Sequence, residues 1–284
     1  MTDIPPDIAD RLRAARGFIF DMDGTLALGD AASGGHKALP GAVEVLARLR
    51  TRGTPFRVFT NGTAKPPAAY AASLRKAGFD IADAEMMTPA TAAAAWFVAK
   101  GIRRVRVLGI EGSIVPLRAA GLEVIGPSES ADGVEAVFTA WFREFGFPDL
   151  EAACRDVWTG ARLTTASNVP FFATAGGRSI GSSFAINAMI SAMTGKRAAI
   201  LGKPARAAFD TALSLMGLPK HAASSVVVVG DDPALEMRMA RAAGALAVGM
   251  TTGLETRDSF LAAPPRDRPD LILDAVGVLG EALD

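Results

Sequence analysis

Two aspartates stand two residues apart where an apolar run ends. Asp21 and Asp23 follow Gly17–Phe20, which is expected to form a short buried strand, and Gly24 indicates a turn just after them. On an extended chain, residues i and i+2 point to the same side. Both carboxylates would then reach the end of the strand, where open α/β sheets bind their ligands. One could attack an electrophile while the other transfers a proton or helps to hold a metal ion.

This stretch has two other interpretations. An Asp-Gly pair is common in turns, so a purely structural turn is one alternative. Asp-x-Asp-Gly also occurs in calcium-binding EF-hand loops, which need further oxygen ligands and a closing Glu at fixed spacing. Thr25–Leu28 follow Gly24 and supply none of these, which excludes an EF-hand loop.

Polar residues follow three further apolar runs, which are expected to be strands of the same sheet. These strands are Thr54–Phe59, Ala198–Leu201 and Ser225–Val229, and the polar residues after them are Thr60, Asn61, Lys203, Asp231 and Asp232. Each group alone has an ordinary explanation, as a turn, a loop or a cap of the next helix. Together they suit one task. Carboxylates can hold a hard divalent cation, hydroxyl, amide and lysine groups can neutralise a phosphate, and an aspartate is left to attack phosphorus.

At this point the sequence resembles the haloacid dehalogenase-like phosphohydrolases. The resemblance rests on Asp21-x-Asp23-Gly24-Thr25, Thr60-Asn61, Lys203 in a Gly-Lys-Pro sequence, and Gly230-Asp231-Asp232, which occur in the family's order. The long stretch between Asn61 and Lys203 is similar to the branch that inserts a large α/β cap, the NagD-like or 4-nitrophenylphosphatase-like proteins.

The resemblance implies a role for each motif. Asp21 would be the nucleophile that forms an aspartyl-phosphate, and Asp23 would be the general acid and base. Mg²⁺ would be bound by the Asp21 carboxylate, the Asp23 backbone carbonyl and Asp231.

The remaining motif residues would bind the phosphate. Thr60 and Asn61 would donate hydrogen bonds to phosphate oxygens, Gly62 would offer its backbone N–H, and Lys203 would offset negative charge. The family usually carries a further acid after its last motif, for which Asp232 and Glu236 are the candidates, and we favour Glu236 as an outer-shell partner of the metal.

The alternation of strand and helix signals predicts an α/β protein with a doubly wound, Rossmann-like parallel sheet. The expected catalytic core covers residues 1–88 and 183–284, and the inserted α/β cap covers residues 89–182. Candidate substrate contacts in the cap are Asn168, which could instead form an Asx turn, and Arg178, which could instead be solvated. His36 and His221 are expected in loops, and neither has a neighbour in the sequence that suggests a metal site.

Composition narrows the class of protein further. The 284 residues include 30 Lys and Arg and 30 Asp and Glu, which argues against binding to nucleic acid or to an anionic membrane. Cys154 is the single cysteine, so no disulfide framework is expected. No export signal and no apolar stretch of the roughly 18–20 residues that span a membrane are evident, so a soluble, cytoplasmic protein is expected.

The leading functional hypothesis is a Mg²⁺-dependent phosphatase for small phosphate monoesters. Sugar phosphates, nucleotides, phosphoglycolate and pyridoxal phosphate are the substrate types that the resemblance implies. The alternatives are a phosphotransferase or mutase that uses the same nucleophile, and a non-catalytic regulator that binds a phosphorylated metabolite. The expected partner is a small phosphorylated metabolite, and a homodimer is an expectation taken from the resemblance alone.

Overall fold

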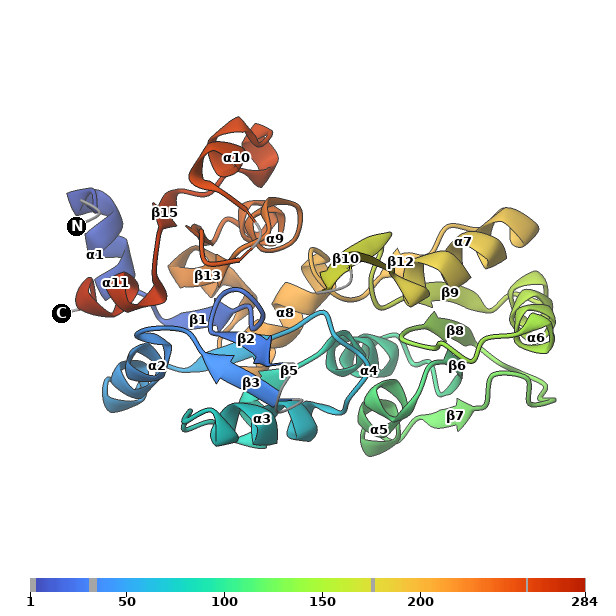
Figure 1. Ribbon diagram of the computed structural model, residues 1–284. Helices are drawn as coiled ribbons and strands as arrows, with labels where there is room; N and C mark the ends of the chain where they lie inside the picture. Colours follow the sequence, from blue (N-terminus) through green and yellow to red (C-terminus); the bar gives the residue numbers. More distant parts are fainter. Residues whose placement is uncertain (1–3, 31–34, 175–176, 254, 284) are drawn as a thin grey trace. The chain divides into compact units, whose positions relative to one another are not determined.

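The chain folds into two compact units, each built on a parallel β-sheet (Figure 1). The computed structural model describes residues 4–30, 35–174, 177–253 and 255–283. The first unit contains the chain up to Thr60, Ala68–Met87 and the chain from Phe209 onward, and the second contains Asn61–Pro67 and Thr88–Ala208. Among the described residues, none of the helices has the length and apolarity to cross a membrane.

The first unit has a six-stranded sheet with the strand order β15-β14-β13-β1-β4-β5. Neighbouring strands all run parallel. Its strands are β1 (Gly17–Phe20), β4 (Phe56–Phe59), β5 (Met86–Met87), β13 (Val226–Gly230), β14 (Leu246–Met250) and β15 (Leu271–Leu273). Its α-helices are α1 (Pro6–Arg13), α2 (Ala42–Thr51), α3 (Pro67–Lys76), α8 (Arg206–Leu215), α9 (Arg238–Ala243), α10 (Arg257–Ala262) and α11 (Val276–Glu281). Shorter helical turns are η1 (Asp83–Glu85), η2 (Lys220–Ser225), η3 (Pro233–Met237) and η4 (Pro265–Asp267).

The central strands of this sheet are apolar on both faces because helices cover both. β1 and β13 are buried along their whole length, as expected for parallel strands in a doubly wound sheet. Phe20 pairs with Val229 on one side and with Val58 on the other, so β1, β13 and β4 end close to one level. The α/β, doubly wound fold predicted from the sequence is confirmed, and the polar residues that follow these strands emerge at one edge.

The second unit is also α/β. Its five-stranded parallel sheet has the order β12-β9-β8-β6-β7. The strands are β6 (Arg104–Leu108), β7 (Glu123–Ile125), β8 (Ala136–Thr139), β9 (Arg162–Thr165) and β12 (Ala199–Ile200), and the helices are α4 (Pro89–Ala99), α5 (Glu111–Ala119), α6 (Phe147–Trp158) and α7 (Ser182–Thr194).

The division between the units differs from the sequence expectation at its second boundary. The sequence placed the return to the core at residue 183, whereas the second unit extends to Ala208. The reason is tertiary: Ile186 and Ile190 of α7 share a buried apolar cluster with Val157 of α6, and Ala199 of β12 pairs with Thr164 of β9. The first boundary, expected after residue 88, lies after Met87.

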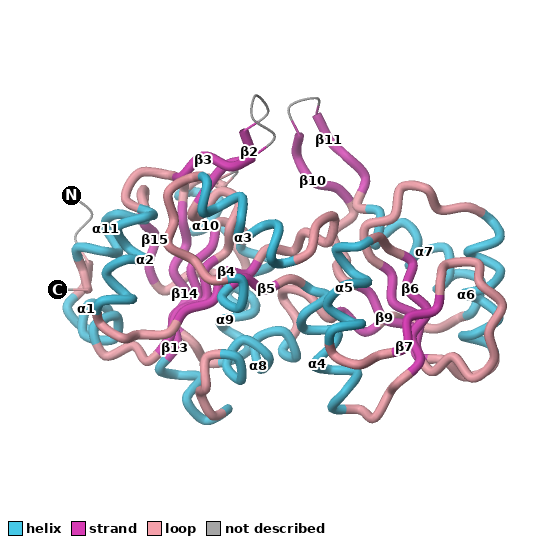
Figure 2. The backbone as a smooth tube through the Cα atoms, turned by 90° about the horizontal axis from the view of Figure 1, so that it is seen from below, coloured by secondary structure: helices cyan, strands magenta, loops and turns pink. Residues whose placement is uncertain are grey.

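Each unit also carries an antiparallel hairpin that the sequence analysis did not anticipate (Figure 2). In the first unit β2 (Ala27–Asp30) pairs with β3 (Gly35–Ala38), and Gly29 lies opposite His36. In the second unit β10 (Phe171–Thr174) pairs with β11 (Gly177–Ile180). His36 therefore belongs to a strand, not to the loop that was predicted.

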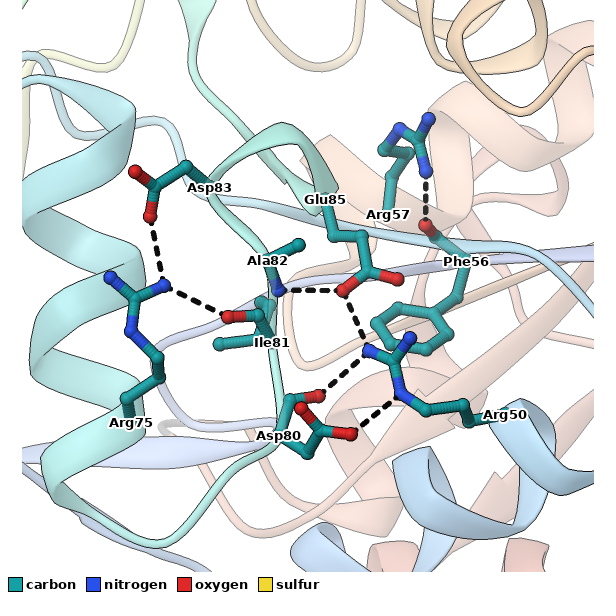
Figure 3. Close-up of polar contacts among 9 residues, drawn as sticks. All are labelled: Arg50, Phe56, Arg57, Arg75, Asp80, Ile81, Ala82, Asp83 and Glu85. Atoms are coloured by element: carbon teal, nitrogen blue, oxygen red, sulfur yellow. Dashed lines mark hydrogen bonds and ion pairs between the residues drawn. The ribbon is translucent and has the colours of Figure 1, made fainter.

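A group of charged side chains fixes the segment that leads into the edge strand β5 (Figure 3). Arg50 of α2 contacts the Asp80 carboxylate at 2.9 Å and the Glu85 carboxylate at 2.8 Å. Arg75 of α3 contacts Asp83 at 2.8 Å. The hydrogen bond that Arg50 donates to the Glu85 carboxylate is the main reason that the pKa of Arg50 is raised. These pairs are largely exposed, so each contributes at most about 1 kcal/mol, and together they anchor the approach to β5.

Candidate active site

The candidate nucleophile and the candidate acid–base residue lie in different surroundings. Asp21 follows β1 directly, is only 7% exposed, and donates its backbone N–H to the Val229 carbonyl at 2.8 Å. Asp23 lies in the turn that follows, and 56% of its side chain is exposed. Gly24 adopts a left-handed φ of 84°, which allows the chain to turn back toward β2. Two carboxylates in distinct environments can take two distinct roles.

Thr60 contacts the exposed aspartate. It follows β4 and is buried, and its Oγ1 lies 3.5 Å from Asp23 Oδ2. The pairing of β1 with β4 produces this contact across 37 residues of sequence. Thr60 of the second motif thus lies beside the first motif within the first unit.

Asp231 meets the first motif from the other neighbouring strand. It follows β13, and its Oδ2 lies so close to Gly24 that a Cβ added there would be 2.3 Å away. A Cβ added at Gly253 would lie 1.7 Å from the same oxygen. The Asp231 carboxylate is thereby packed between two glycines that leave it the necessary room.

Thr252 and Gly253 are residues that the sequence analysis missed. They follow β14, and Thr252 Oγ1 donates to the Gly24 carbonyl at 2.5 Å. The signal was available, because Thr251-Thr252-Gly253 is another polar stretch after an apolar strand of the same sheet. Applying the strand-end rule to β14 would have found it.

Asp232 and Glu236, the two candidates for a further acid, have different roles. The Asp232 side chain accepts from the Ala234 N–H at 2.7 Å and caps the start of η3. Glu236 is only 2% exposed, and its Oε2 accepts from the Asp232 N–H at 3.1 Å. A Cβ added at Gly230 would lie 2.2 Å from Glu236 Cγ, so the glutamate packs directly beneath the end of β13. Glu236 is thus buried next to Gly230, the residue that precedes Asp231 in the chain.

Asn61 and Lys203 are joined within the second unit. The Asn61 carboxamide accepts from the Lys203 N–H at 2.9 Å and donates to the Lys203 carbonyl at 3.2 Å. Lys203 is only 2% exposed. The Asn61 side chain therefore holds the backbone of the loop that carries Lys203, and the phosphate contact implied by the resemblance stays a prediction. Gly62 directly follows Asn61 in the chain and is partly exposed.

The two candidate cap contacts also belong to the second unit. Asn168 is exposed, and the turn beside it is made by Ser167, whose Oγ accepts from the Val169 N–H at 3.2 Å. Arg178 of β11 is exposed and places its guanidinium 4.4 Å from the centre of the Phe171 ring on β10. Arg178 thus has a cation–π partner within its own hairpin.

The residues of the first unit suit a hard divalent cation. Among the residues that the structure describes, no three His, Cys, Asp or Glu side chains are grouped as metal ligands. Mg²⁺ in proteins is commonly bound by one or two carboxylates together with other oxygen atoms. Asp21, the Asp23 carbonyl and Asp231 are all oxygen donors, and the two glycines around Asp231 leave space for its carboxylate.

Comparison with known proteins identifies the family that this chain resembles. Residues 18–123 match the family described as haloacid dehalogenase-like hydrolase, and residues 200–279 match the family described as HAD-hydrolase-like. Human chronophin is 27% identical over 293 residues, spanning 98% of this chain and 96% of its own.

Solved structures extend the likeness to three dimensions. The p-nitrophenyl phosphatase from Archaeoglobus fulgidus is 26% identical with a TM-score of 0.83, covering 95% of this chain and 99% of its own. The glycerol phosphate phosphatase from Mycobacterium tuberculosis in complex with magnesium is 25% identical with a TM-score of 0.81, covering 95% of this chain and 77% of its own.

The fold and the relatives together identify the chain as a phosphatase built on a parallel sheet. The chain belongs to the haloacid dehalogenase-like hydrolases, in the NagD-like and 4-nitrophenylphosphatase-like branch.

Proposed function

We propose that this protein is a Mg²⁺-dependent phosphatase that hydrolyses small phosphate monoesters through an aspartyl-phosphate. The observation that carries the proposal is the convergence of buried Asp21, exposed Asp23 and Asp231 at the ends of β1 and β13. Two relatives are named for p-nitrophenyl phosphate and glycerol phosphate, which supports a small monoester as the substrate.

Asp21 would act as the nucleophile. One of its carboxylate oxygens would form a bond to phosphorus while the bond from phosphorus to the ester oxygen breaks. Asp23 would donate a proton to the departing oxygen, so that the alcohol leaves neutral. Asp23 would then take a proton from water as that water attacks the phosphorus of the aspartyl-phosphate, which releases phosphate and restores Asp21.

Charge explains why further groups are needed. A carboxylate that approaches a phosphate dianion is repelled, because like charges at short range raise the energy of attack. Mg²⁺, when bound by Asp21, the Asp23 carbonyl and Asp231, would supply compensating charge. Lys203, the Gly62 N–H, the Thr60 hydroxyl and the Asn61 amide would bind phosphate oxygens.

The proposed partners follow from the same chemistry. The substrate would be a small phosphorylated metabolite in the cytoplasm, with Asn168 and Arg178 of the second unit as candidate contacts to the part beyond the phosphate. Homodimer formation stays a prediction, which light scattering on the purified protein would test.

The first experiment measures phosphate release from a panel of monoesters, with Mg²⁺ and with EDTA. Asp21→Asn should lower kcat by at least about 10³-fold because the amide is a poor nucleophile. Asp7→Asn, at an exposed position of α1, is the matched control and should behave as wild type.

Three results would count against this function. These are wild-type turnover in Asp21→Asn, turnover that persists in EDTA, and phosphate transfer to an added alcohol in place of release. The last outcome would indicate a phosphotransferase.

A further inference from the structure

The imidazole of His36 lies beside the carboxylate of Asp23. His36 is on β3, and its Nε2 is 3.6 Å from Asp23 Oδ1. Its side chain is only 9% exposed, whereas the Asp23 side chain is 56% exposed. A largely buried ring at the edge of an exposed carboxylate is well placed to restrict how that carboxylate turns.

The other side of the ring is fixed by α3. His36 Nδ1 lies 2.8 Å from Ser73 Oγ, which is a hydrogen-bonding distance. When the Asp23 carboxylate is ionised it can only accept, so the tautomer that suits it carries its proton on Nε2 and accepts from the Ser73 hydroxyl at Nδ1. Ser73 thereby holds the ring in the tautomer and orientation in which it serves Asp23.

Asp23 is flanked on both of its oxygens. Oδ1 faces His36 from the β2–β3 hairpin, and Oδ2 faces Thr60 Oγ1 from the end of β4. Both distances, 3.6 and 3.5 Å, are long for hydrogen bonds, as is common for catalytic groups without bound substrate. A polar group beside each oxygen limits how far the carboxyl plane can turn.

We propose that His36 is a positioning residue for Asp23, set in place by Ser73. The inference rests on the proposed function, in which Asp23 protonates the departing oxygen. The orientation of the Asp23 carboxyl group matters most when the departing ester oxygen needs a proton in order to leave. An alkoxide leaves very poorly without one, whereas p-nitrophenolate is stable enough to leave unprotonated.

The experiment compares two esters on the same preparation of each variant. Glycerol phosphate is the alkyl ester and p-nitrophenyl phosphate is the aryl ester. In His36→Ala we expect kcat/KM for the alkyl ester to fall about 10- to 100-fold, part of the effect of general acid catalysis, and that for the aryl ester to fall less than about threefold. His36→Gln places an N–H near the position of Nε2 and should recover most of the loss.

Two features make the result decisive. The ratio of the two kcat/KM values does not depend on the fraction of protein that is folded, so poor folding of a variant cannot produce the expected selectivity. His221→Ala removes the other histidine, which is exposed on η2, and should leave the ratio unchanged.

The proposal is overturned if His36→Ala loses both activities equally or loses neither, or if His36→Gln does not recover the alkyl ester. Failure of the proposed function gives a different result, because wild-type protein would then hydrolyse neither ester before any variant is compared.

Discussion

The carboxylate of Asp231 occupies the space into which a side chain at Gly253 would project. A Cβ at that position would lie 1.7 Å from Asp231 Oδ2 and 2.5 Å from its Cγ. Gly253 follows β14 and Asp231 follows β13, so two adjacent parallel strands bring them together. The position of a candidate metal ligand is thus set by a residue that has no side chain.

Gly253→Ala tests this dependence directly. An added Cβ would meet Oδ2, Cγ and Cβ of Asp231, the last at 2.8 Å, so the whole Asp231 side chain must shift and we expect a displaced carboxylate. The Mg²⁺ concentration for half-maximal activity should rise about tenfold or more, because an oxygen ligand of the ion has moved. Titration of activity with Mg²⁺ measures it.

Gly29→Ala is the matched control, since nothing lies within 4 Å of a Cβ added there. An unchanged Mg²⁺ titration in Gly253→Ala would argue against Asp231 as a ligand.

We expect Asp232 to have a structural role and Glu236 to affect metal binding. Asp232→Ala removes the cap of η3 and should cost about 1 kcal/mol of stability, with the Mg²⁺ titration unchanged. Glu236→Gln keeps the shape and an oxygen acceptor for the Asp232 N–H but loses the negative charge behind Asp231. It should weaken Mg²⁺ binding about 10-fold or more, in the range typical of outer-shell partners. The reverse pattern would assign the outer-shell role to Asp232.

The pair formed by Arg238 and Asp267 should make stability depend on pH. Both guanidinium contacts are 2.7 Å long, and these hydrogen bonds hold the pKa of Asp267 below its usual range. A carboxyl whose folded-state pKa is lowered stabilises the protein above its unfolded pKa of about 3.9, and that stabilisation is lost as pH falls through the folded pKa. Asp267→Asn should therefore cost about 1–2 kcal/mol at pH 7, because the pair is only partly exposed.

Urea unfolding at several pH values measures this difference, which should stay constant down to about pH 5 and shrink below pH 4. Asp274→Asn breaks a more exposed pair with Arg257 and should cost at most about 1 kcal/mol. An equal cost for Asp267→Asn at pH 3 and pH 7 would contradict the assignment.

The second unit contains a buried arginine, Arg106, and removal of its carboxylate partner should destabilise the protein. Arg106 is 1% exposed, and its Nε lies 2.5 Å from Asp156 Oδ2. Its Nη1 donates to the carbonyls of Gly126, Pro127 and Glu129 at 2.7, 3.1 and 2.8 Å. Asp156→Ala leaves this guanidinium without its counter-charge and should destabilise the protein by about 3–5 kcal/mol.

Glu123→Ala is the comparison, because it breaks a pair with Arg104 on the same sheet in which the glutamate side chain is 55% exposed. We expect a loss of at most about 1 kcal/mol. Thermal unfolding of both variants measures the contrast, and similar midpoints would show that the buried pair carries no special cost.

Much of the first unit could be predicted because its buried parallel strands have a clear sequence signal. β1 and β13 are short, wholly apolar runs that end in polar motifs, and parallel strands place such ends at one edge. Asp21, Asp23, Thr60 and Asp231 were therefore identified without any knowledge of the contacts between them.

Other features lay beyond this kind of reasoning. The two hairpins consist of four-residue strands with little alternation of apolar and polar residues, so no periodic signal marked them. The expected cap ends at residue 182, and only the pairing of β12 with β9 assigns Ala199–Ile200 to the second sheet.

The sequence by itself determined the fold class, the family and the types of residue that could perform the chemistry, since burial pattern and strand ends are local properties. Only the tertiary structure decided how these residues serve one another. His36 meets Asp23 through a hairpin, Asn61 holds Lys203 across 142 residues, and Gly253 makes room for Asp231. These relationships depend on packing between distant segments, and packing is fixed only when the whole chain has folded.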